Sequence, residues 1–177
     1  MSDKHVKNRL LTNRGIGKKF HNMSLTDYPN DRAKEVLSWL EDDASKDLAL
    51  GKGLIFFGET QDGYDIAVLT ARAMILSGFS KLHCVSFTLA LEYETIQTFW
   101  EEKCPVMITY FQPENTHVEA ERYKRLENLL NYYLDNGIPV FLHIPVDHSK
   151  QIIEYGNMIS PVFLDRLLKT NTLFSIG

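Results

Sequence analysis

The part of the sequence that most constrains the fold is a short apolar run followed directly by a glycine-rich turn and an apolar helix. Residues 54–57 are all apolar and lead into Gly58, which is typical of a strand buried on both faces. Residues 66–76 are apolar almost all round, which predicts a buried helix that ends at Ser77 and Gly78. A buried strand and a buried helix in succession indicate an α/β fold.

The rest of the chain repeats this alternation of apolar runs and helical patterns. Further strands are expected at 82–87, 106–111, 139–144 and 173–176, and further helices at 31–50, 90–100 and 118–134. Strands that alternate with helices of this length form βαβ units, and βαβ units form parallel sheets. We therefore expect a three-layer α/β/α sandwich around a mostly parallel five-stranded sheet.

The turn at residues 58–65, GETQDGYD, has the spacing of a phosphate-binding loop without its functional residues. Gly58 and Gly63 provide the G-x-x-x-x-G frame, but Tyr64 and Asp65 stand where a Lys and a Ser or Thr are required. The alternative is an ordinary turn between a strand and a helix. In that case Asp65 caps the helix or adds a favourable negative charge to its first turn.

Phosphoryl transfer needs a Lys on the phosphates, a hydroxyl on magnesium and acidic residues at a strand end. The turn has neither a Lys nor a Ser or Thr at the positions that require them, and Glu59 and Asp62 add negative charge beside Asp65. Two like charges 4 Å apart repel by about 4 kcal/mol at an effective dielectric constant of about 20, which weakens binding roughly a thousandfold. We expect no bound ATP or magnesium and no catalytic residue.

Composition narrows the class of protein. The 177 residues, 44% of them hydrophobic, suffice for one compact domain. The sequence has neither an apolar run that could span a bilayer nor a secretory signal, so we expect a cytoplasmic protein without membrane contact. Cys84 and Cys104 lack the close spacing of a zinc site, and we expect reduced, buried thiols and no metal.

Positive charge gathers only at the N-terminus, although the net charge of the chain is −4. The cations of this stretch are opposed only by Asp3, and they are Lys4, Lys7, Arg9, Arg14, Lys18 and Lys19. We divide the chain into a basic N-terminal arm at 1–22 and a single domain at 23–177. The arm is expected either to be solvated and mobile or to contact DNA or an acidic protein.

Three segments besides the glycine turn carry a family resemblance. Residues 15–28 look like a G-I-P-x-R-F stretch followed by Ser or Thr, an apolar residue and an aromatic residue. The run at 104–111 lies where a Walker B strand would end in two acids, but it ends in Tyr110 and Phe111. Residues 160–168 are similar to an S-R-L or D-R-L element whose Arg matches Arg166. With these features, the chain resembles the DnaC/IstB-type branch of AAA+ ATPases.

The resemblance implies a P-loop NTPase core of the AAA+ or RecA-like kind with degenerate nucleotide motifs. In this family the Arg at the position of Arg166 acts in trans on the nucleotide of a neighbouring subunit. Arg166 could do the same for a competent neighbour in a homo- or hetero-oligomer, or it could be a surface ion-pair partner.

The function implied is that of a noncatalytic AAA+ homologue in DNA replication initiation, as helicase loader, loader accessory or regulator. Its partner would be a replicative helicase or the loader of that helicase. Only residues 1–14 precede Gly15, so we expect contact through the AAA+ surface and the basic arm. One alternative is a DNA-binding replication or transposition ATPase that retains weak nucleotide binding. Another is an interaction module with no role on nucleic acid.

Overall fold

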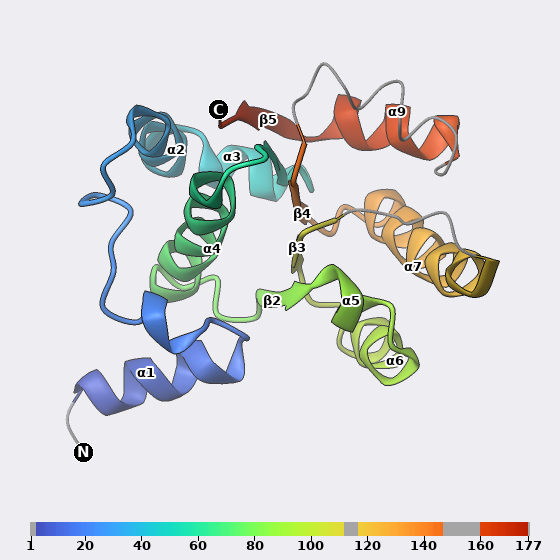
Figure 1. The fold of residues 1–177 in the computed structure, drawn as a ribbon, viewed down its shortest axis with the longest axis horizontal. Coiled ribbons are helices and arrows are strands. Elements are labelled where there is room, and N and C mark those ends of the chain that lie inside the picture. The colour runs from blue at the N-terminus through green and yellow to red at the C-terminus, as the bar shows by residue number, and fades with distance from the viewer. Residues whose placement is uncertain (1–2, 112–116, 147–159, 177) are drawn as a thin grey trace.

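The computed structural model describes residues 3–111, 117–146 and 160–176. Within these residues, five parallel strands form one sheet in the order β2-β3-β4-β1-β5 (Figure 1). The strands are β1 (Leu54–Phe57), β2 (His83–Ser86), β3 (Val106–Thr109), β4 (Val140–Ile144) and β5 (Thr172–Ser175). Each predicted run overlaps one strand, although β5 begins one residue before its run, so the parallel sheet expected from the sequence is confirmed.

Helices cover both faces of the sheet and complete the three layers (Figure 1). One face carries α1 (Asp3–Asn13), the 3-10 helix η1 (Lys18–Phe20), α2 (Asp31–Asp42), α3 (Ala44–Ala49) and α4 (Gln61–Leu76). The other carries α5 (Phe87–Ala90), α6 (Tyr93–Glu102), α7 (His117–Asp135) and α9 (Pro161–Thr170). Among the described helices, none combines the length and the apolar character needed to cross a bilayer.

The two faces of the sheet have separate hydrophobic cores, and β1 contributes to both. Leu54 and Phe56 are buried in the core beneath α4, whereas Ile55 and Phe57 are buried in the core beneath α7. Successive side chains of a strand point to opposite faces, so a strand covered on both sides must be apolar at every position. Burying each such side chain contributes about 1.5–3 kcal/mol, which explains the unbroken apolar run.

The strand register brings the ends of three strands together. Phe56 of β1 is aligned with His143 of β4. Gly58 follows β1 directly, and Tyr110 follows β3 directly. Because parallel strands end at the same edge of a sheet, these residues lie at one carboxyl edge, where α/β proteins bind their ligands.

The N-terminal region departs from the expected arm. Residues 3–13 form α1, and Leu11, Ile16 and Phe20 are each no more than 2% exposed in the core beneath α4. The predicted boundary between residues 22 and 23 therefore does not separate an arm from a domain. The sequence analysis predicted an arm because cations predominate in this segment. The few apolar residues between them nevertheless anchor the segment in the core.

Two helical patterns are interrupted where the sequence predicted continuous helices. The pattern at 31–50 divides into α2 and α3 at Asp43. The break lets Trp39 Nε1 donate a hydrogen bond of 2.9 Å to Asp47. The pattern at 90–100 is likewise divided between α5 and α6. Periodicity persists across such short breaks, so it locates the apolar face without locating the break.

Candidate functional site

The turn between β1 and α4 is shorter than the glycine spacing suggested. Helix α4 begins at Gln61, so Gly63 lies inside its first turn, and its amide donates to the carbonyl of Thr60 over 3.1 Å. Asp65 comes after the first turn, and the helix starts after Thr60 without a side-chain cap. The prediction that Asp65 caps the helix or adds charge to its first turn was therefore wrong.

Close packing explains both glycines of the frame. A Cβ atom on Gly58 would lie 2.2 Å from the carbonyl oxygen of Ile176. A Cβ atom on Gly63 would lie 3.1 Å from the carbonyl oxygen of Gly58 and 3.3 Å from Nε2 of His143. The two glycines thus bring the turn, α4 and the end of β4 into direct contact. Their spacing is accounted for without a bound phosphate.

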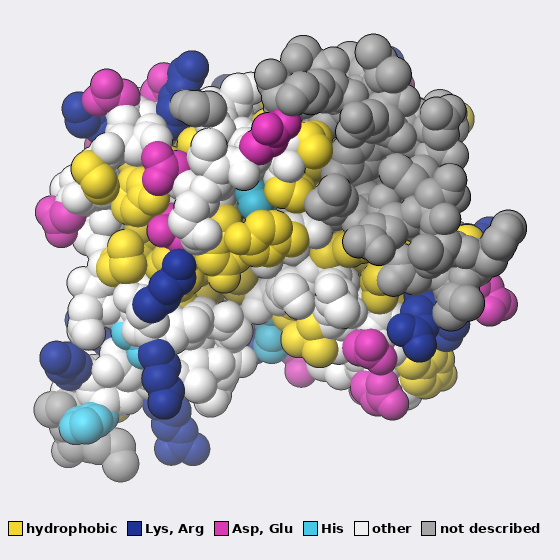
Figure 2. Space-filling view, viewed as in Figure 1, with side chains coloured by type: hydrophobic (Ala, Val, Ile, Leu, Met, Phe, Trp, Pro, Cys, Tyr) yellow, Lys and Arg dark blue, Asp and Glu magenta, His cyan; other side chains and the backbone are white. Residues whose placement is uncertain are grey.

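Aromatic side chains gather above this turn. Tyr64 is stacked on Tyr110, with ring centroids 4.9 Å apart and planes 25° apart, and it meets Phe20 edge-on at 5.9 Å. Burial, above all, raises the pKa of Tyr64, which therefore stays a neutral phenol. Tyr110 is 44% exposed, and Figure 2 shows hydrophobic side chains at the surface in the middle of this face.

Tyr110 also adopts an uncommon backbone conformation. Its φ of 54° lies in the left-handed region, which costs a residue with a Cβ atom about 1–3 kcal/mol. This conformation follows the last residue of β3 and accompanies a hydrogen bond from the Tyr110 amide to His143 Nδ1, 3.3 Å long. Tyr110 is thereby held over Tyr64.

His143 lies buried beneath the aromatic side chains and contacts both Tyr64 and Tyr110. Its side chain is fully buried, its Nδ1 accepts from the Tyr110 amide, and its Nε2 lies 3.3 Å from the carbonyl oxygen of Gly58. Because Nδ1 accepts, Nε2 must carry the proton and donate to Gly58. Burial lowers the pKa of His143 to about 4, against the opposing effect of the Gly58 carbonyl. The imidazole is therefore neutral at pH 7.

Two acidic residues of the turn, Asp62 and Asp65, contact the segment at 19–30. Asp62 accepts hydrogen bonds from the Tyr28 hydroxyl over 2.8 Å and from Asn30 Nδ2 over 2.9 Å. Asp65 lies 3.0 Å from Lys19 Nζ and accepts from Gln61 Nε2 over 2.7 Å. Burial and the Asp62 hydrogen bond raise the pKa of Tyr28, so its hydroxyl stays a donor.

These contacts change one part of the electrostatic expectation. The repulsion of about 4 kcal/mol was calculated for an uncompensated Asp65, but the Lys19 ammonium lies beside that carboxylate. Lys19 also lies 5.3 Å from the centroid of the Tyr64 ring. The turn therefore repels a phosphate less than expected. The aromatic side chains become the larger obstacle to phosphate binding, because they occupy the space above the turn.

The structure separates the two residues expected at the acidic positions of a Walker B strand. Tyr110 faces Tyr64 and His143. Phe111 is buried in the core on the opposite face of the sheet, where it meets Phe87 edge-on at 5.1 Å. Only Tyr110 therefore belongs to the candidate site.

Arg166 lies on α9, and its guanidinium contacts α7. It donates to Asn131 Oδ1 over 2.9 Å and to Asp135 Oδ1 over 2.7 Å. This arrangement is the intramolecular pairing expected of a surface arginine. A role for Arg166 in trans stays a prediction, since it requires release of the guanidinium from α7.

The six N-terminal cations are divided between internal contacts and the surface. Lys19 pairs with Asp65, and the Arg14 guanidinium contacts Nε2 of His83 on β2. The remaining four are exposed and form no ion pair within the described part of the chain: Lys4, Lys7, Arg9 and Lys18. Only Lys19 lies at the candidate site.

One group of side chains has ligand atoms close enough for a metal ion. Donor atoms of His83, Glu102 and Cys104 lie within 4.8 Å of one another. The Arg14 guanidinium contacts His83 and places a positive charge beside the group. Burial, foremost, raises the pKa of Cys104 to about 11, so the thiol keeps its proton at pH 7. Both features disfavour a bound cation.

Sequence reasoning singled out Tyr64 and Tyr110 separately, in two different motifs, and missed the residues that hold them together. Tyr28 and Asn30 drew no attention, although Tyr28 ends the stretch that resembles the family motif. A buried polar residue in an otherwise apolar strand, such as His143 in β4, is the signal that could have identified the site.

Comparisons with known proteins support the fold. Neither a protein-family model nor a curated protein matches the chain. Among solved structures, the fold is similar to that described as "Crystal structure of the DnaC helicase loader", with a TM-score of 0.63 and 14% sequence identity. The match covers 91% of this chain and 100% of that chain. It confirms the predicted α/β architecture as a DnaC-like P-loop NTPase fold.

Proposed function

We propose that the chain is a noncatalytic AAA+ homologue that acts in the cytoplasm in DNA replication initiation. It serves as a helicase loader, a loader accessory or a loader regulator, and it works through protein contacts without nucleotide turnover. The observation that supports this proposal best is the stacking of Tyr64 on Tyr110 above the phosphate-loop glycines.

The aromatic cluster opposes phosphate binding in two ways. A phosphate above Gly63 would have to displace Tyr64 from Tyr110 and Phe20, and each aromatic pair contributes about 0.5–1.5 kcal/mol beyond its buried area. The displaced Tyr64 offers no positive charge in return, whereas a Lys would neutralise the phosphate. The Gly63 amide is already bonded to Thr60. We infer that the turn holds α4 against the sheet and does not bind ATP.

The association with replication comes from the fold, since the similar structure is named as a helicase loader. A homologue without nucleotide turnover can still occupy a binding surface of a helicase or a loader. It would then act by its presence, and its effect would follow its concentration. Such a protein needs a rigid AAA+ surface. The two buried cores hold the helices against the sheet and so keep the surface of those helices in place.

Nucleotide binding is the first test. Isothermal titration of the chain with ATP and magnesium is expected to give no saturable heat. The double variant Tyr64→Lys with Asp65→Thr removes the stacked ring and restores the two missing groups, so it is expected to bind ATP with a Kd of the order of 1 mM. Tyr93→Lys with Glu94→Thr makes the same change in charge at two exposed positions of α6 and serves as the control. Saturable binding by the unmodified chain would support the alternative of a weakly nucleotide-binding ATPase.

Partner binding is the second test. The immobilised chain is exposed separately to the purified replicative helicase and to the purified helicase loader of its host. Saturable retention of either protein, unchanged when ATP is omitted, is the expected result. Retention of neither, by a chain that shows a cooperative unfolding transition, would remove the replication role. Arg166→Ala then reports whether the arginine on α9 contributes to the contact.

A further inference from the structure

The helices α6 and α7 form a mainly apolar groove on the face of the sheet opposite α4. Its volume is about 250 Å³. The described side chains that line this α6–α7 groove come from one face of each helix, and they are Tyr93, Ile96, Gln97, Trp100, Arg125 and Asn128. Ile96 is buried, whereas Tyr93 is 59% exposed and Trp100 is 37% exposed. Two large aromatic side chains therefore stand at the surface beside the groove.

Both walls of the α6–α7 groove are held in place by contacts within the domain. Tyr133 of α7 is fully buried, and its hydroxyl donates a hydrogen bond of 2.9 Å to the carbonyl of Phe99 on α6. The ring of Trp100 packs against the ring of Tyr132, with centroids 4.7 Å apart. The groove is thus preformed, which lowers the ordering cost of binding a partner.

A cation lies next to an aromatic ring at each end of the groove. Cζ of Arg125 is 6.0 Å from the ring centroid of Tyr93, at the start of α6. Lys103 follows the last residue of α6 with a φ of 48°, and its Nζ is 5.8 Å from the ring centroid of Tyr132. Neither cation forms an ion pair within the described residues. Both charges are therefore available to an anionic partner.

The acidic residues of α6 determine on which side such a partner can carry its charge. Glu94 and Glu101 are exposed, and neither is among the described residues that line the groove. Glu101 accepts a hydrogen bond of 3.0 Å from Nε2 of Gln97. Like charges repel, so the carboxylates of a partner belong on the side of α7, near Arg125, and away from these two residues.

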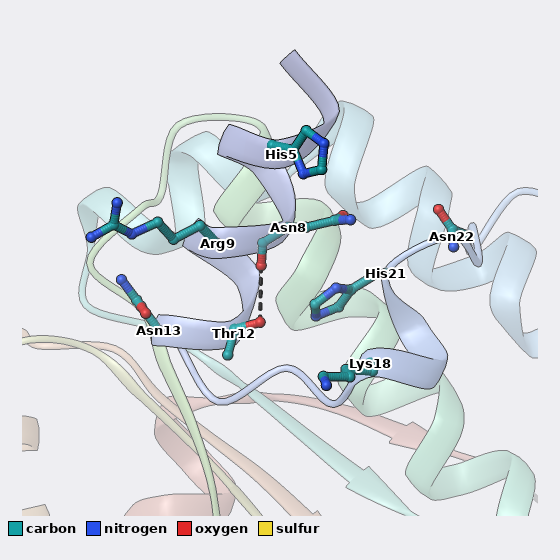
Figure 3. Close-up of a pocket in the computed structure, with 8 residues that line it drawn as sticks. All are labelled: His5, Asn8, Arg9, Thr12, Asn13, Lys18, His21 and Asn22. Carbon is teal, nitrogen blue, oxygen red and sulfur yellow. Dashed lines mark hydrogen bonds between the residues drawn. The ribbon is translucent and has the colours of Figure 1, made fainter. Parts of the chain in front are cut away.

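The lining of the groove favours a protein segment over a small molecule. Trp, Tyr and Arg are the residue types that most often dominate binding at protein interfaces, and the groove presents all three. Its volume lies below the range of about 300–1,000 Å³ that is usual for small-molecule sites. By contrast, the described residues that line the hollow between α1 and the η1 segment are all polar or charged (Figure 3). That hollow lacks the apolar centre that a protein interface needs.

The walls of the groove favour a helix over an extended segment. An extended segment gains its affinity from main-chain hydrogen bonds to the edge of a sheet, whereas the main-chain groups of a helix are bonded within that helix. A third helix can instead pack its side chains between those of α6 and α7. Tyr93 and Trp100 are seven positions apart on α6, a distance of about 10 Å, which corresponds to two turns of such a helix.

We propose that the α6–α7 groove binds an amphipathic helix of a partner protein that carries acidic residues beside its apolar face. Arg125 and Lys103 receive the carboxylates of this helix, and its apolar side chains pack between Tyr93 and Trp100. The inference rests on the proposed function for the existence of a protein partner. It goes further by assigning the surface of contact and the chemistry of the segment that is bound.

Fluorescence anisotropy with a labelled synthetic peptide tests the groove directly. The probe is an Ala-rich helical peptide of about 16 residues with Leu at positions i, i+3 and i+7 and Glu beside them, and a second peptide has Lys in place of each Glu. Saturable binding of the Glu peptide is expected, with a Kd of the order of 0.1 mM or lower. Binding of neither peptide, or equal binding of both, would overturn the proposal.

A reversal of charge at Arg125 tests the assigned contact. Arg125→Glu should weaken binding of the Glu peptide by about tenfold or more and should favour the Lys peptide. Arg9→Glu makes the same change at an exposed cation that lines the hollow of Figure 3, and it should leave binding within about twofold of the unmodified chain. Equal weakening by both variants would mean that only net charge matters, and the groove would be refuted.

The binding assay with the purified helicase and loader separates this proposal from the proposed function. A chain that retains one of these proteins equally well as Arg125→Glu would refute the groove and keep the proposed function. A chain that binds the Glu peptide and retains neither protein would keep the groove and remove the replication role. Dimerisation of the unmodified chain that Arg125→Glu abolishes would assign the groove to a second copy and overturn the proposal.

Discussion

Lowering the pH should destabilise the protein through His143 more than through any exposed histidine. The pKa of His143 is about 4 in the folded state, against about 6.5 in an unfolded chain. Between these values the unfolded state binds more protons, so stability is fully present above pH 6.5 and is lost as the pH falls toward 4. Protonated Nδ1 would also face the amide of Tyr110, which is itself a donor.

The size of this effect follows from the difference in pKa. Each unit between the folded and unfolded states is equivalent to about 1.4 kcal/mol. The His143 contribution to the free energy of unfolding should therefore fall by about 3 kcal/mol between pH 7 and pH 4. That loss is a large share of the 5–15 kcal/mol that is typical of a domain.

Urea unfolding of the unmodified chain and of His143→Gln across this pH range would measure the loss. Glutamine can keep a donor toward Gly58 and does not titrate, so the variant should be less stable at pH 7 and should lose less stability on acidification. His5→Gln, at an exposed position, is the matched control and should follow the unmodified chain. Parallel loss in the unmodified chain and His143→Gln, within about 0.5 kcal/mol, would refute the reasoning.

Three further substitutions test the site by urea unfolding at pH 7. Tyr28→Phe removes the hydroxyl that donates to Asp62 and should cost about 1–2 kcal/mol, an effect that should largely vanish when Asp62 is also replaced by Ala, which has no acceptor. Gly58→Ala forces a Cβ atom to within 2.2 Å of the Ile176 carbonyl oxygen, and it should cost more than about 2 kcal/mol or prevent folding. Arg166→Ala breaks a part-exposed pair and should cost at most about 1 kcal/mol; a larger loss would mean that α9 depends on this contact.

The sequence predicted the sheet well because the relevant signal is local. The apolar run at 54–57 can be read without its neighbours, because a strand buried on both faces must be apolar at every position. The parallel direction of the strands then follows from the helices between the runs, whereas the order of the strands in the sheet was not predicted. The start of α4 at Gln61 was missed, since Gly63 suggested a loop, and its fit between Gly58 and His143 depends on the folded chain.

The candidate site was predictable only in outline. The turn after β1 and the end of β3 place Tyr64 and Tyr110 at one edge, but the stacking of their rings depends on packing against Phe20 and His143, which are distant in sequence. The Tyr28 hydrogen bond to Asp62 joins residues 34 positions apart, and no periodicity connects them. The N-terminal segment was mistaken for an arm because charge dominated the reading of its composition, while Leu11 and Phe20 determine its position.

The hydrogen bond between the Arg14 carbonyl and the Cys84 amide has a consequence for how copies of this chain behave toward one another. β2 is an edge strand, and the Cys84 amide points away from β3, toward the N-terminal segment that covers it. Uncovered edge strands pair with edges of other molecules and promote aggregation. Loss of residues 1–14 would expose this edge, so a truncated chain should self-associate at concentrations at which the unmodified chain does not.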